Sequence, residues 1–318
     1  MSMKEFEISK NDASQRLDKF ITKAVPRLPL SLMQKYIRTK RIKVNNKRSQ
    51  KDYRLIEGDT VQLYINDEFF EAKYEDENAF IKLKTSLDIV YEDENIILIN
   101  KPKGMLCHDD DKESFNTLAN HIKSYLYHKN EYDPKSENSF VPSLCNRIDR
   151  NTQGIVIAAK NAVALRIMNE KIKNREIDKY YICIAHGYFK EKNGILKGYL
   201  TKDAVKKEIK VYKSKVPDAM SIITGYTVLK EKDGLSLVEV KLETGRTHQI
   251  RAHFASVGHP LLGDGKYGTN ATNKQYGLKS QALCSYKLKF NFKTDGDILS
   301  YLNGKTFKID LPEIFKSF

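Results

Sequence analysis

Long apolar segments and targeting signals are absent from this 318-residue sequence. No uninterrupted apolar run is long enough to span a membrane, and the first residues, MSMKEFEISKNDAS, lack the apolar middle part of a signal peptide. We therefore expect a cytoplasmic protein that does not insert into a membrane. The length favours two domains, at least one of which can bury a sizeable core.

Cysteine is scarce, and its spacing argues against a structural metal site. The sequence contains no pair of cysteines close enough to form a CxxC motif. We therefore expect no structural zinc. Without a secretory signal, free thiols are a simpler interpretation than disulfides. The cysteines are Cys107, Cys145, Cys183 and Cys284.

Common nucleotide-binding and hydrolase motifs are missing as well. The sequence has no G-x-x-x-x-G-K-S/T loop, no G-x-G-x-x-G that opens a helix after a strand, and no G-x-S-x-G elbow. The missing glycine motif argues against a methyltransferase. His248, His253 and His259 lie close together in sequence, but their spacing fits no common zinc motif. We therefore expect no metal site.

Positive charge is what the sequence has in excess. Lysine and arginine number 55 against 41 aspartates and glutamates, which gives a formal net charge of +14. Such an excess favours a polyanionic partner, either nucleic acid or an anionic membrane surface, although solvated lysines give the same composition. Between Lys35 and Lys51 no acidic residue interrupts the basic ones, which weakens the interpretation as a solvated face. We predict phosphate contacts for Lys35, Arg38, Arg41, Lys43, Lys47 and Arg48.

The residues around this basic run predict a small module of helices and short strands. Apolar residues recur at helical spacing over 17–24, and Ser31 is expected to cap a second helix with Gln34 three positions later. The apolar stripe of that helix is narrow, which favours packing in the module over membrane binding. The segments RLDKFI, LSLMQKYIRTKRIKVNN and GDTVQLY resemble, in this order, the S-four-like RNA-binding domain over roughly residues 14–65. Residues 1–70 are therefore expected to form a small α/β domain of that kind, with RNA as its partner.

A second domain is expected after an acidic, unpatterned segment at 71–85, which we interpret as a linker. In the domain at 86–318, DIVYEDENIILIN predicts two strands joined by a polar turn, and GIVIAAK, KYYICIAHG and LSLVEVKL predict further strands. A helix is expected after Asn161, which can cap it. Because strands and helices do not alternate strictly, the pattern predicts a mixed α+β domain. Residues 191–230 are lysine-rich and give no clear pattern.

The segment NRIDRNTQGIVIAAK, residues 146–160, places the carboxylate of Asp149 between Arg147 and Arg150. Flanking arginines favour the ionised carboxylate, which suits a nucleophile or an electrostatic partner and not a general acid. The alternative is a structural arginine–aspartate pair in a turn. The residues alone favour that alternative.

A second polar segment, ETGRTHQIRAHFASVGHPLLGDGKYG at 243–268, combines arginines and histidines with several glycines. Ile250, Phe254 and Val257 recur at i, i+4 and i+7, which predicts an amphipathic helix entered through TGRTH. The N-terminal end of such a helix can hold a phosphate or a carboxylate. A well-capped helix with surface arginines explains the same residues equally well.

Together these segments resemble the RluA-type RNA pseudouridine synthases. NRIDRNTQGIVIAAK is similar to the family's HRLDRDTSGLLLLAK, INKPKGMLCH to VNKPAGMVVH, and KYYICIAHG to KxYLALVxG, while TGRTHQIRAHFASVGHPLLGDGKYG matches the family signature almost without change. The segments follow the family's order over roughly residues 88–290. An N-terminal S-four-like domain is also a known family arrangement. The resemblance implies a catalytic domain built on a mixed, mainly antiparallel β-sheet.

The resemblance also implies roles for particular residues. Asp149 stands at the position of the catalytic aspartate, and Arg251 at that of the arginine paired with it. Tyr181 matches the tyrosine that packs against the target base, and Arg147 matches the arginine that helps to displace this base from its helix. Two departures, Asn146 in place of the family's histidine and NTQG in place of DTSG, concern contacts around the displaced base and leave the carboxylate and its arginine unchanged.

By this resemblance the protein isomerises uridine to pseudouridine at specific sites in RNA, without a metal or a cofactor. We expect large-subunit (23S) ribosomal RNA as the substrate, because an S-four-like domain fused to this catalytic domain usually accompanies such targets. Transfer RNA is the alternative substrate, and a non-catalytic RNA-binding or ribosome-assembly role is the alternative function. The protein is expected to be a monomer.

Overall fold

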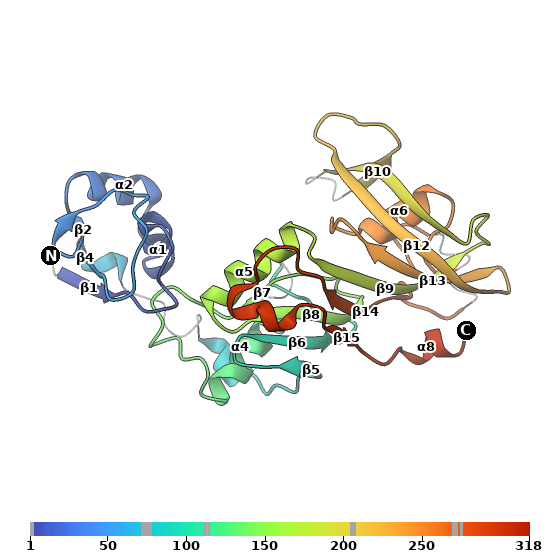
Figure 1. Ribbon diagram of the computed structural model, residues 1–318, viewed down its shortest axis with the longest axis horizontal. Helices are drawn as coiled ribbons and strands as arrows, with labels where there is room; N and C mark the ends of the chain where they lie inside the picture. Colours follow the sequence, from blue (N-terminus) through green and yellow to red (C-terminus); the bar gives the residue numbers. More distant parts are fainter. Residues whose placement is uncertain are drawn as a thin grey trace. The chain divides into compact units, whose positions relative to one another are not determined.

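The computed structural model describes residues 3–70, 78–110, 113, 115–203, 208–268, 273 and 276–318 (Figure 1). The chain divides into two compact units that are interleaved along the sequence. Unit 1 comprises Met1–Ser86, Ala119–Ser143 and Ala159–Arg166, and unit 2 comprises Leu87–Leu118, Leu144–Ala158 and Ile167–Phe318. The domain boundaries expected from the sequence, at 70 and 86, stay a prediction.

Residues 3–70, which we call the N-terminal module, contain two helices and a small sheet that share one core. The strands lie in the order β1-β4-β2-β3, and neighbours pair antiparallel. Helix α1 buries Leu17, Phe20 and Ile21, which confirms the apolar face predicted from the sequence. The elements are β1 (Met3–Glu7), α1 (Leu17–Ala24), α2 (Leu30–Arg38), β2 (Ile42–Val44), β3 (Lys47–Arg48), β4 (Thr60–Tyr64) and η1 (Asp67–Phe69).

The predicted start of α2 is wrong. Ser31 does not cap the helix but lies inside its first turn, and the N-cap position belongs to Pro29. The carbonyl of Pro29 accepts the first helical hydrogen bond, from the amide of Met33 at 2.9 Å. The helix starts early because the fixed φ of proline, −57° here, suits the entry to a helix.

The predicted linker at 71–85 is described only from residue 78 onward, since residues 71–77 lie outside the described ranges. The described part is anchored and not extended: it forms the short helix η2 (Ala79–Lys82), and Phe80 is 3% exposed. The ring of Phe80 packs against Tyr127 of helix α4 (Leu118–His128) and against Tyr132. The contacts of Phe80 therefore fix the described part of this segment within unit 1.

An extended mixed sheet dominates the rest of the chain (Figure 1). Its strands follow the order β11-β10-β12-β13-β9-β14-β8-β6-β5, with β15 beside β14 and β7 beside β8. From β11 to β14 the neighbours pair antiparallel, whereas β14 and β8 pair in parallel. The expected mixed, mostly antiparallel sheet is therefore confirmed. The strands are β5 (Ile89–Glu92), β6 (Ile96–Lys101), β7 (Ser143–Leu144), β8 (Gln153–Ala159), β9 (Ile177–His186), β10 (Asn193–Asp203), β11 (Glu208–Tyr212), β12 (Met220–Lys232), β13 (Leu235–Leu242), β14 (Leu283–Phe290) and β15 (Thr306–Lys308).

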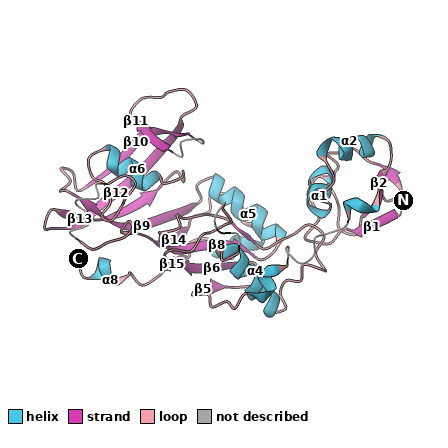
Figure 2. Ribbon diagram, turned by 180° about the vertical axis from the view of Figure 1, so that it is seen from behind, coloured by secondary structure: helices cyan, strands magenta, loops and turns pink. Residues whose placement is uncertain are grey.

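Helices flank this sheet (Figure 2). The side chains of strand β9 alternate between the two faces of the sheet. Ile182 and Ile184 lie in an apolar cluster with Phe315. Tyr181 points to the opposite face, because successive side chains of a strand alternate. The helices are α5 (Ala162–Lys173), α6 (Gln249–Ser256), η3 (Asp297–Leu302) and α8 (Glu313–Lys316).

Two helix predictions in this part differ in outcome. Asn161 caps α5 as predicted, because its Oδ1 accepts a hydrogen bond from the amide of Ala164 at 2.8 Å. Helix α6 forms as predicted and buries Ile250 and Phe254, but it ends before Val257, which is 41% exposed. The helix therefore carries a shorter apolar face than the spacing suggested.

Residues 191–230, which gave no clear pattern, form most of β10, β11 and β12. Much of β10 alternates between exposed and half-buried positions, and two of the exposed positions are the lysines Lys197 and Lys202. A strand with little fully buried surface has weak hydrophobic alternation, which is why the sequence did not reveal it.

Candidate active site

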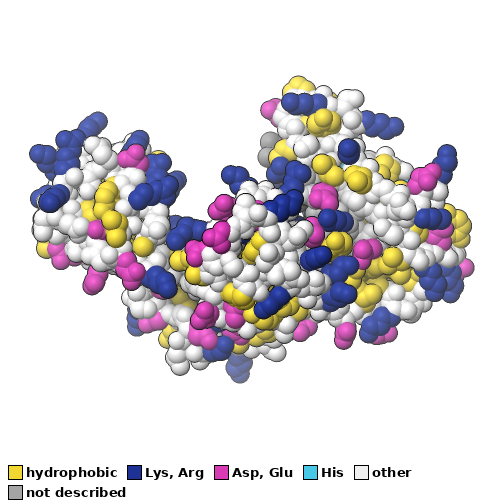
Figure 3. All heavy atoms as spheres, in the orientation of Figure 1, with side chains coloured by type: hydrophobic (Ala, Val, Ile, Leu, Met, Phe, Trp, Pro, Cys, Tyr) yellow, Lys and Arg dark blue, Asp and Glu magenta, His cyan; other side chains and the backbone are white. Residues whose placement is uncertain are grey.

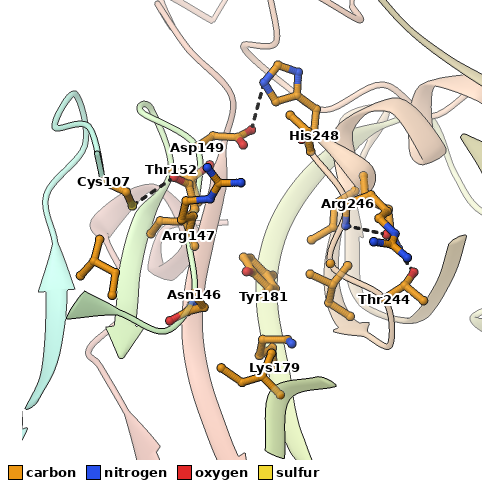
Figure 4. Close-up of a pocket in the computed structure, with 18 of the residues that line it drawn as sticks. Cys107, Asn146, Arg147, Asp149, Thr152, Lys179, Tyr181, Thr244, Arg246 and His248 are labelled. Atoms are coloured by element: carbon orange, nitrogen blue, oxygen red, sulfur yellow. Dashed lines mark hydrogen bonds and ion pairs between the residues drawn. The ribbon is translucent and has the colours of Figure 1, made fainter. Parts of the chain in front are cut away.

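A pocket of about 880 Å³ in unit 2 brings the segments singled out from the sequence together (Figure 4). Asp149, Tyr181, Arg251 and Arg147 all line it. Three different regions supply them: the loop between β7 and β8, strand β9 and helix α6. The volume lies within the range of small-molecule sites, roughly 300–1,000 Å³.

Asp149 is paired with Arg251, although 102 residues separate them. The Nη1 of Arg251 donates to Oδ2 of Asp149 at 2.9 Å. In the described part of the chain no hydrogen bond reaches the other oxygen, Oδ1. The side chain of Asp149 is 22% exposed and that of Arg251 is 9% exposed. A charged carboxylate is thus held by one oxygen at the edge of the pocket.

A second carboxylate, that of Asp264, fixes the guanidinium of Arg251. Its Oδ2 accepts from Nε at 2.7 Å and its Oδ1 from Nη2 at 2.9 Å, the bidentate geometry that arginine favours. Asp264 is fully buried. Burial alone would raise its pKa, but the hydrogen bonds and charge of Arg251 lower it, so the carboxylate stays ionised. Burial alone would lower the pKa of Arg251, but the carboxylates of Asp264 and Asp149 raise it above its usual value. The guanidinium therefore stays charged between the two carboxylates.

The backbone beside Asp149 is fastened by Lys101, the last residue of β6, which is fully buried. Its ammonium donates to the carbonyls of Pro102 at 2.9 Å, Met105 at 2.8 Å and Arg150 at 3.0 Å. The amide of Gly104 donates to the same Arg150 carbonyl at 2.9 Å. Burial lowers the pKa of Lys101 to about 8. The conformation of the loop that carries Asp149 therefore depends on a lysine of the KPKG segment.

Tyr181 is 5% exposed and lines the pocket from β9. Burial is the main reason that its pKa lies above the usual value for tyrosine, and the nearby Asp149 adds to the effect. The hydroxyl is therefore protonated at neutral pH. Lys179, two residues earlier on the same strand, also lines the pocket, and burial lowers its pKa. Figure 4 shows both side chains on the strand that passes below Asp149.

The two arginines adjacent to Asp149 are not its partners. Arg147 is exposed, lines the pocket, and makes no salt bridge within the described residues. Arg150 is also exposed, and its Nε donates to the carbonyl of Gly104 at 2.9 Å. The interpretation of NRIDR as a local arginine–aspartate pair is therefore wrong.

Asn146, which departs from the family pattern, and two nearby residues that agree with the pattern have structural contacts. The Oδ1 of Asn146 accepts from the amide of Ile157 at 2.8 Å, which ties the loop to β8. Thr152 is buried, and its hydroxyl accepts from Gln281 at 3.2 Å. Gly154 has φ +130°, and a Cβ at that position would lie 2.2 Å from the carbonyl oxygen of Ser285. The parallel pairing of β8 with β14 at this point therefore requires glycine.

The six predicted phosphate contacts all lie in the N-terminal module. Four are exposed, namely Lys35, Arg38, Lys47 and Arg48. Arg41 and Lys43 are half-buried, and their cationic groups lie over aromatic rings, Arg41 over Tyr36 at 4.7 Å and Lys43 over Tyr64 at 5.1 Å. Figure 3 shows lysine and arginine side chains on the surface of this module.

The clustered histidines do not converge on one point. The Nδ1 of His253 lies 2.9 Å from the hydroxyl of Thr224, and the Nδ1 of His259 lies 2.9 Å from the carbonyl oxygen of His186. In the described part of the chain no group of three or more His, Cys, Asp or Glu side chains could hold a metal ion. The four cysteines are free. Across the described ranges, no helix has both the length and the apolar character to cross a membrane.

Several residues of the site were not identified from the sequence. Asp264 stands in GDGKYG, where an aspartate between glycines is typical of a turn. Only the structure shows that it is buried and pairs with Arg251. Lys101 belongs to the KPKG segment, but the sequence does not show that its side chain points into the interior of the protein. His248 was predicted only as part of the polar segment at 243–268 and not as a neighbour of Asp149, yet its ring lies beside Asp149 and Tyr267.

Several known proteins and one family model are similar to this chain. A family model described as RNA pseudouridylate synthase matches residues 95–256. An uncharacterized RNA pseudouridine synthase of Mycoplasma genitalium is 33% identical over 290 residues, which covers 90% of this chain and 88% of that protein. A protein of Buchnera aphidicola named ribosomal large subunit pseudouridine synthase C is 32% identical over 267 residues, which covers 82% of this chain and 79% of that protein.

Among solved structures, human RNA pseudouridylate synthase domain containing 4 matches with a TM-score of 0.57 at 22% identity. The match covers 76% of this chain and 95% of the human chain, and it shows that the fold is shared. The similarity in sequence to the relatives and to the family model shows the family as well as the fold. Since the family model spans just over half of the chain and a 33% identical relative covers 90% of it, this chain belongs to the RNA pseudouridylate synthase family and is an RNA pseudouridine synthase.

Proposed function

We propose that this enzyme converts specific uridines of large-subunit ribosomal RNA to pseudouridine, with Asp149 as the catalytic carboxylate. The observation that carries the assignment of Asp149 is its 2.9 Å contact with Arg251 at the edge of a pocket. An ionised carboxylate in a partly dry site needs an opposite charge to offset its desolvation. Arg251, itself fixed by the buried Asp264, supplies that charge.

The reaction sets clear demands on the carboxylate. The bond between N1 of uracil and C1′ of the sugar breaks, the base turns, and a bond between C5 and C1′ forms. C5 loses a proton and N1 gains one, so the isomerisation is balanced without a second substrate. In our proposal Oδ1 of Asp149 faces the sugar, either as the nucleophile at C1′ or as the charge that stabilises positive character there. Oδ2 stays with Arg251.

Tyr181 and Arg147 have roles before and after that step in this proposal. Removing a base from its helix costs a few kcal/mol and requires a pocket that receives it. The exposed Arg147 is suited to take the place of the departing base or to contact its phosphate. The buried ring of Tyr181 is suited to stack on the detached uracil while it turns, because aromatic side chains hold bases by stacking.

Ribosomal RNA of the large subunit is proposed as the substrate on two grounds. The relative from Buchnera aphidicola is named for that target and is 32% identical to this chain. The N-terminal module, which we propose to be an S-four-like RNA-binding domain, adds an exposed basic surface to the catalytic unit. Both observations favour a long structured RNA over a small substrate.

Mapping of pseudouridines in cellular RNA tests the proposed substrate. RNA from cells with and without the gene is compared at single-nucleotide resolution, and cells that carry the Asp149→Asn variant serve as a matched control. We expect loss of pseudouridine at defined positions of large-subunit ribosomal RNA, restored by the wild-type gene and not by the variant. Loss confined to transfer RNA would refute the ribosomal target.

Neutralising the basic surface of the N-terminal module should weaken RNA binding without changing the chemical step. For the combined Arg38→Gln, Lys47→Gln and Arg48→Gln variant, we expect the magnitude of the slope of log affinity against log salt concentration to fall by about 2–3. The reason is that each phosphate contact that is lost no longer releases a counterion from the RNA. The rate at saturating RNA should stay near that of the wild type. Filter binding over a salt series and single-turnover kinetics measure the two quantities.

A matched control removes the same charge from another exposed surface, with Lys289→Gln, Lys305→Gln and Lys308→Gln in one chain. These lysines lie on or next to β14 and β15 of unit 2. An equal fall in the salt slope for both triple variants would mean that net charge acts, and not the module, and would contradict the proposed role of the module.

A further inference from the structure

His248 lies beside Asp149 and has no role in the chemistry described so far. It immediately precedes α6, and its φ of 52° places it in the left-handed region. Its Nδ1 is 2.9 Å from the hydroxyl oxygen of Tyr267, and its Nε2 is 4.0 Å from Oδ2 of Asp149. Figure 4 shows the ring directed at the carboxylate. The imidazole thus bridges a phenol and the catalytic carboxylate.

Tyr267 ties this imidazole to Arg251 as well. The guanidinium carbon of Arg251 lies 5.2 Å from the centroid of the Tyr267 ring, and the rings of Tyr267 and His248 meet edge to face at 5.7 Å. Tyr267 therefore contacts both side chains that lie beside Asp149, namely His248 and Arg251.

The position of the proton on the imidazole follows from its two neighbours. A neutral imidazole carries hydrogen on one nitrogen only. An unprotonated Nε2 would direct its lone pair at a carboxylate oxygen, which is repulsive, whereas Nε2–H directs a positive end at it. Nδ1 is then the acceptor, and the hydroxyl of Tyr267 is the donor. Burial raises the pKa of Tyr267 to about 12, so the hydroxyl has a proton to donate.

Burial keeps the imidazole of His248 neutral at neutral pH. Burial lowers the pKa of His248 below its usual value. Asp149 and Asp264 act in the opposite direction, while Arg251 and Lys266 reinforce the effect of burial. Because the pKa is lowered, the ring is uncharged at and above pH 7, and its single proton is available for Nε2.

We infer that His248 is a positioning residue for Asp149: its Nε2–H donates to Oδ2 when RNA is bound, and Tyr267 holds the ring in the required tautomer. This inference rests on the proposed catalytic role of Asp149. The 4.0 Å separation has to shorten by about 1 Å, and catalytic hydrogen bonds are often long before substrate binds. Arg251 and His248 then hold Oδ2 between them, so that the carboxylate cannot rotate and Oδ1 is presented to the sugar.

The tautomer of His248 can be read without RNA. The full-length protein, which has seven histidines, is labelled with ¹⁵N-histidine, and the signal of His248 is assigned from its absence in the His248→Gln variant. We expect the wild type to show the Nε2–H tautomer at pH 7–8. In the Tyr267→Phe variant, which lacks the hydroxyl donor, we expect a mixture of both tautomers. An Nδ1–H tautomer in the wild type overturns the inference, because Nε2 could then only accept.

Two variants of His248 distinguish a hydrogen bond donated by its side chain from packing of that side chain alone. Glutamine places an amide N–H near the position of Nε2 and cannot titrate, whereas leucine has a similar size and no donor. We expect the single-turnover rate of His248→Gln to lie within threefold of the wild type, and that of His248→Leu to fall by about 30-fold, as for a lost hydrogen bond to a charged group. The RNA concentration that gives half the maximal rate should not change in either variant.

RNA from cells that lack the gene serves as the substrate, so the assay does not depend on which RNA class is modified. Equal losses for His248→Gln and His248→Leu would overturn the inference, because packing alone would then explain both. If Asp149→Asn were fully active, the proposed function would fail, while the ¹⁵N spectrum would still report the tautomer.

Discussion

Replacement of Asp149 by asparagine should lower the rate of pseudouridine formation by on the order of 10⁴-fold, as found when an enzyme loses a group central to its chemistry. The amide keeps the size of the side chain but carries no negative charge, so it can neither attack C1′ nor stabilise positive character there. Arg251 would lose its second carboxylate but keep Asp264. Single-turnover kinetics with RNA from cells that lack the gene measure the rate.

Binding of RNA should survive in the same variant. Removing a negative charge from a pocket that also contains Arg147, Lys179 and Arg246 favours polyanion binding slightly, so we expect an unchanged or tighter dissociation constant. The exposed Asp310 provides a matched control, because Asp310→Asn makes the same chemical change away from the pocket and should leave the rate unchanged. Substantial product from Asp149→Asn would refute the assignment of the catalytic carboxylate.

Asp264→Asn should also lower the rate, although less than Asp149→Asn does, because Asp264 itself does not reach the substrate in our proposal. Its loss leaves the guanidinium of Arg251 without the bidentate partner that orients it. We expect the single-turnover rate to fall by about 100-fold, since misplacing a catalytic group by about 1 Å has an effect of that size. The free energy of unfolding should fall by about 3 kcal/mol, as when a buried ion pair loses one member.

The Asp12→Asn variant is a control that separates the loss of rate from the loss of stability expected for Asp264→Asn. Asp12 is also fully buried, but it lies in the N-terminal module and accepts hydrogen bonds from Ser9, Asn138 and Ser139. Its replacement should lower the free energy of unfolding and leave the rate per folded molecule near that of the wild type. If urea denaturation and kinetics gave the same pattern for both variants, Asp264 would have no specific role in the active site.

The fold was predictable where the sequence carries local periodicity. The apolar face of α1 and the buried strand β8 are visible as 3.6-residue spacing and as a continuous apolar run. The pairing of Asp149 with Arg251 was expected from resemblance alone, since nothing local connects residues 102 positions apart. Local charge, by contrast, was misleading, because Arg147 and Arg150 flank Asp149 in sequence but do not pair with it.

What could not be predicted depends on burial and on long-range packing. Asp264 looks like a turn residue, and only the surrounding fold makes it a fully buried partner of Arg251. The exposed strand β10 lacks a hydrophobic face that would mark it. The return of residues 119–143 and 159–166 into unit 1 arises from contacts far apart along the chain, which no local pattern encodes.

Lys101 gives the loop beside Asp149 a property that a bound ion could not. Its ammonium sits among three backbone carbonyls at 2.8–3.0 Å, an arrangement that resembles the oxygen cage of a potassium ion. A free ion would occupy such a cage according to its concentration and could exchange with sodium. The Lys101 cation is attached to the chain and is present below its pKa of about 8, at an effective concentration set by its tether. The loop beside Asp149 therefore has the order of an ion-binding site without depending on the ionic composition of its surroundings.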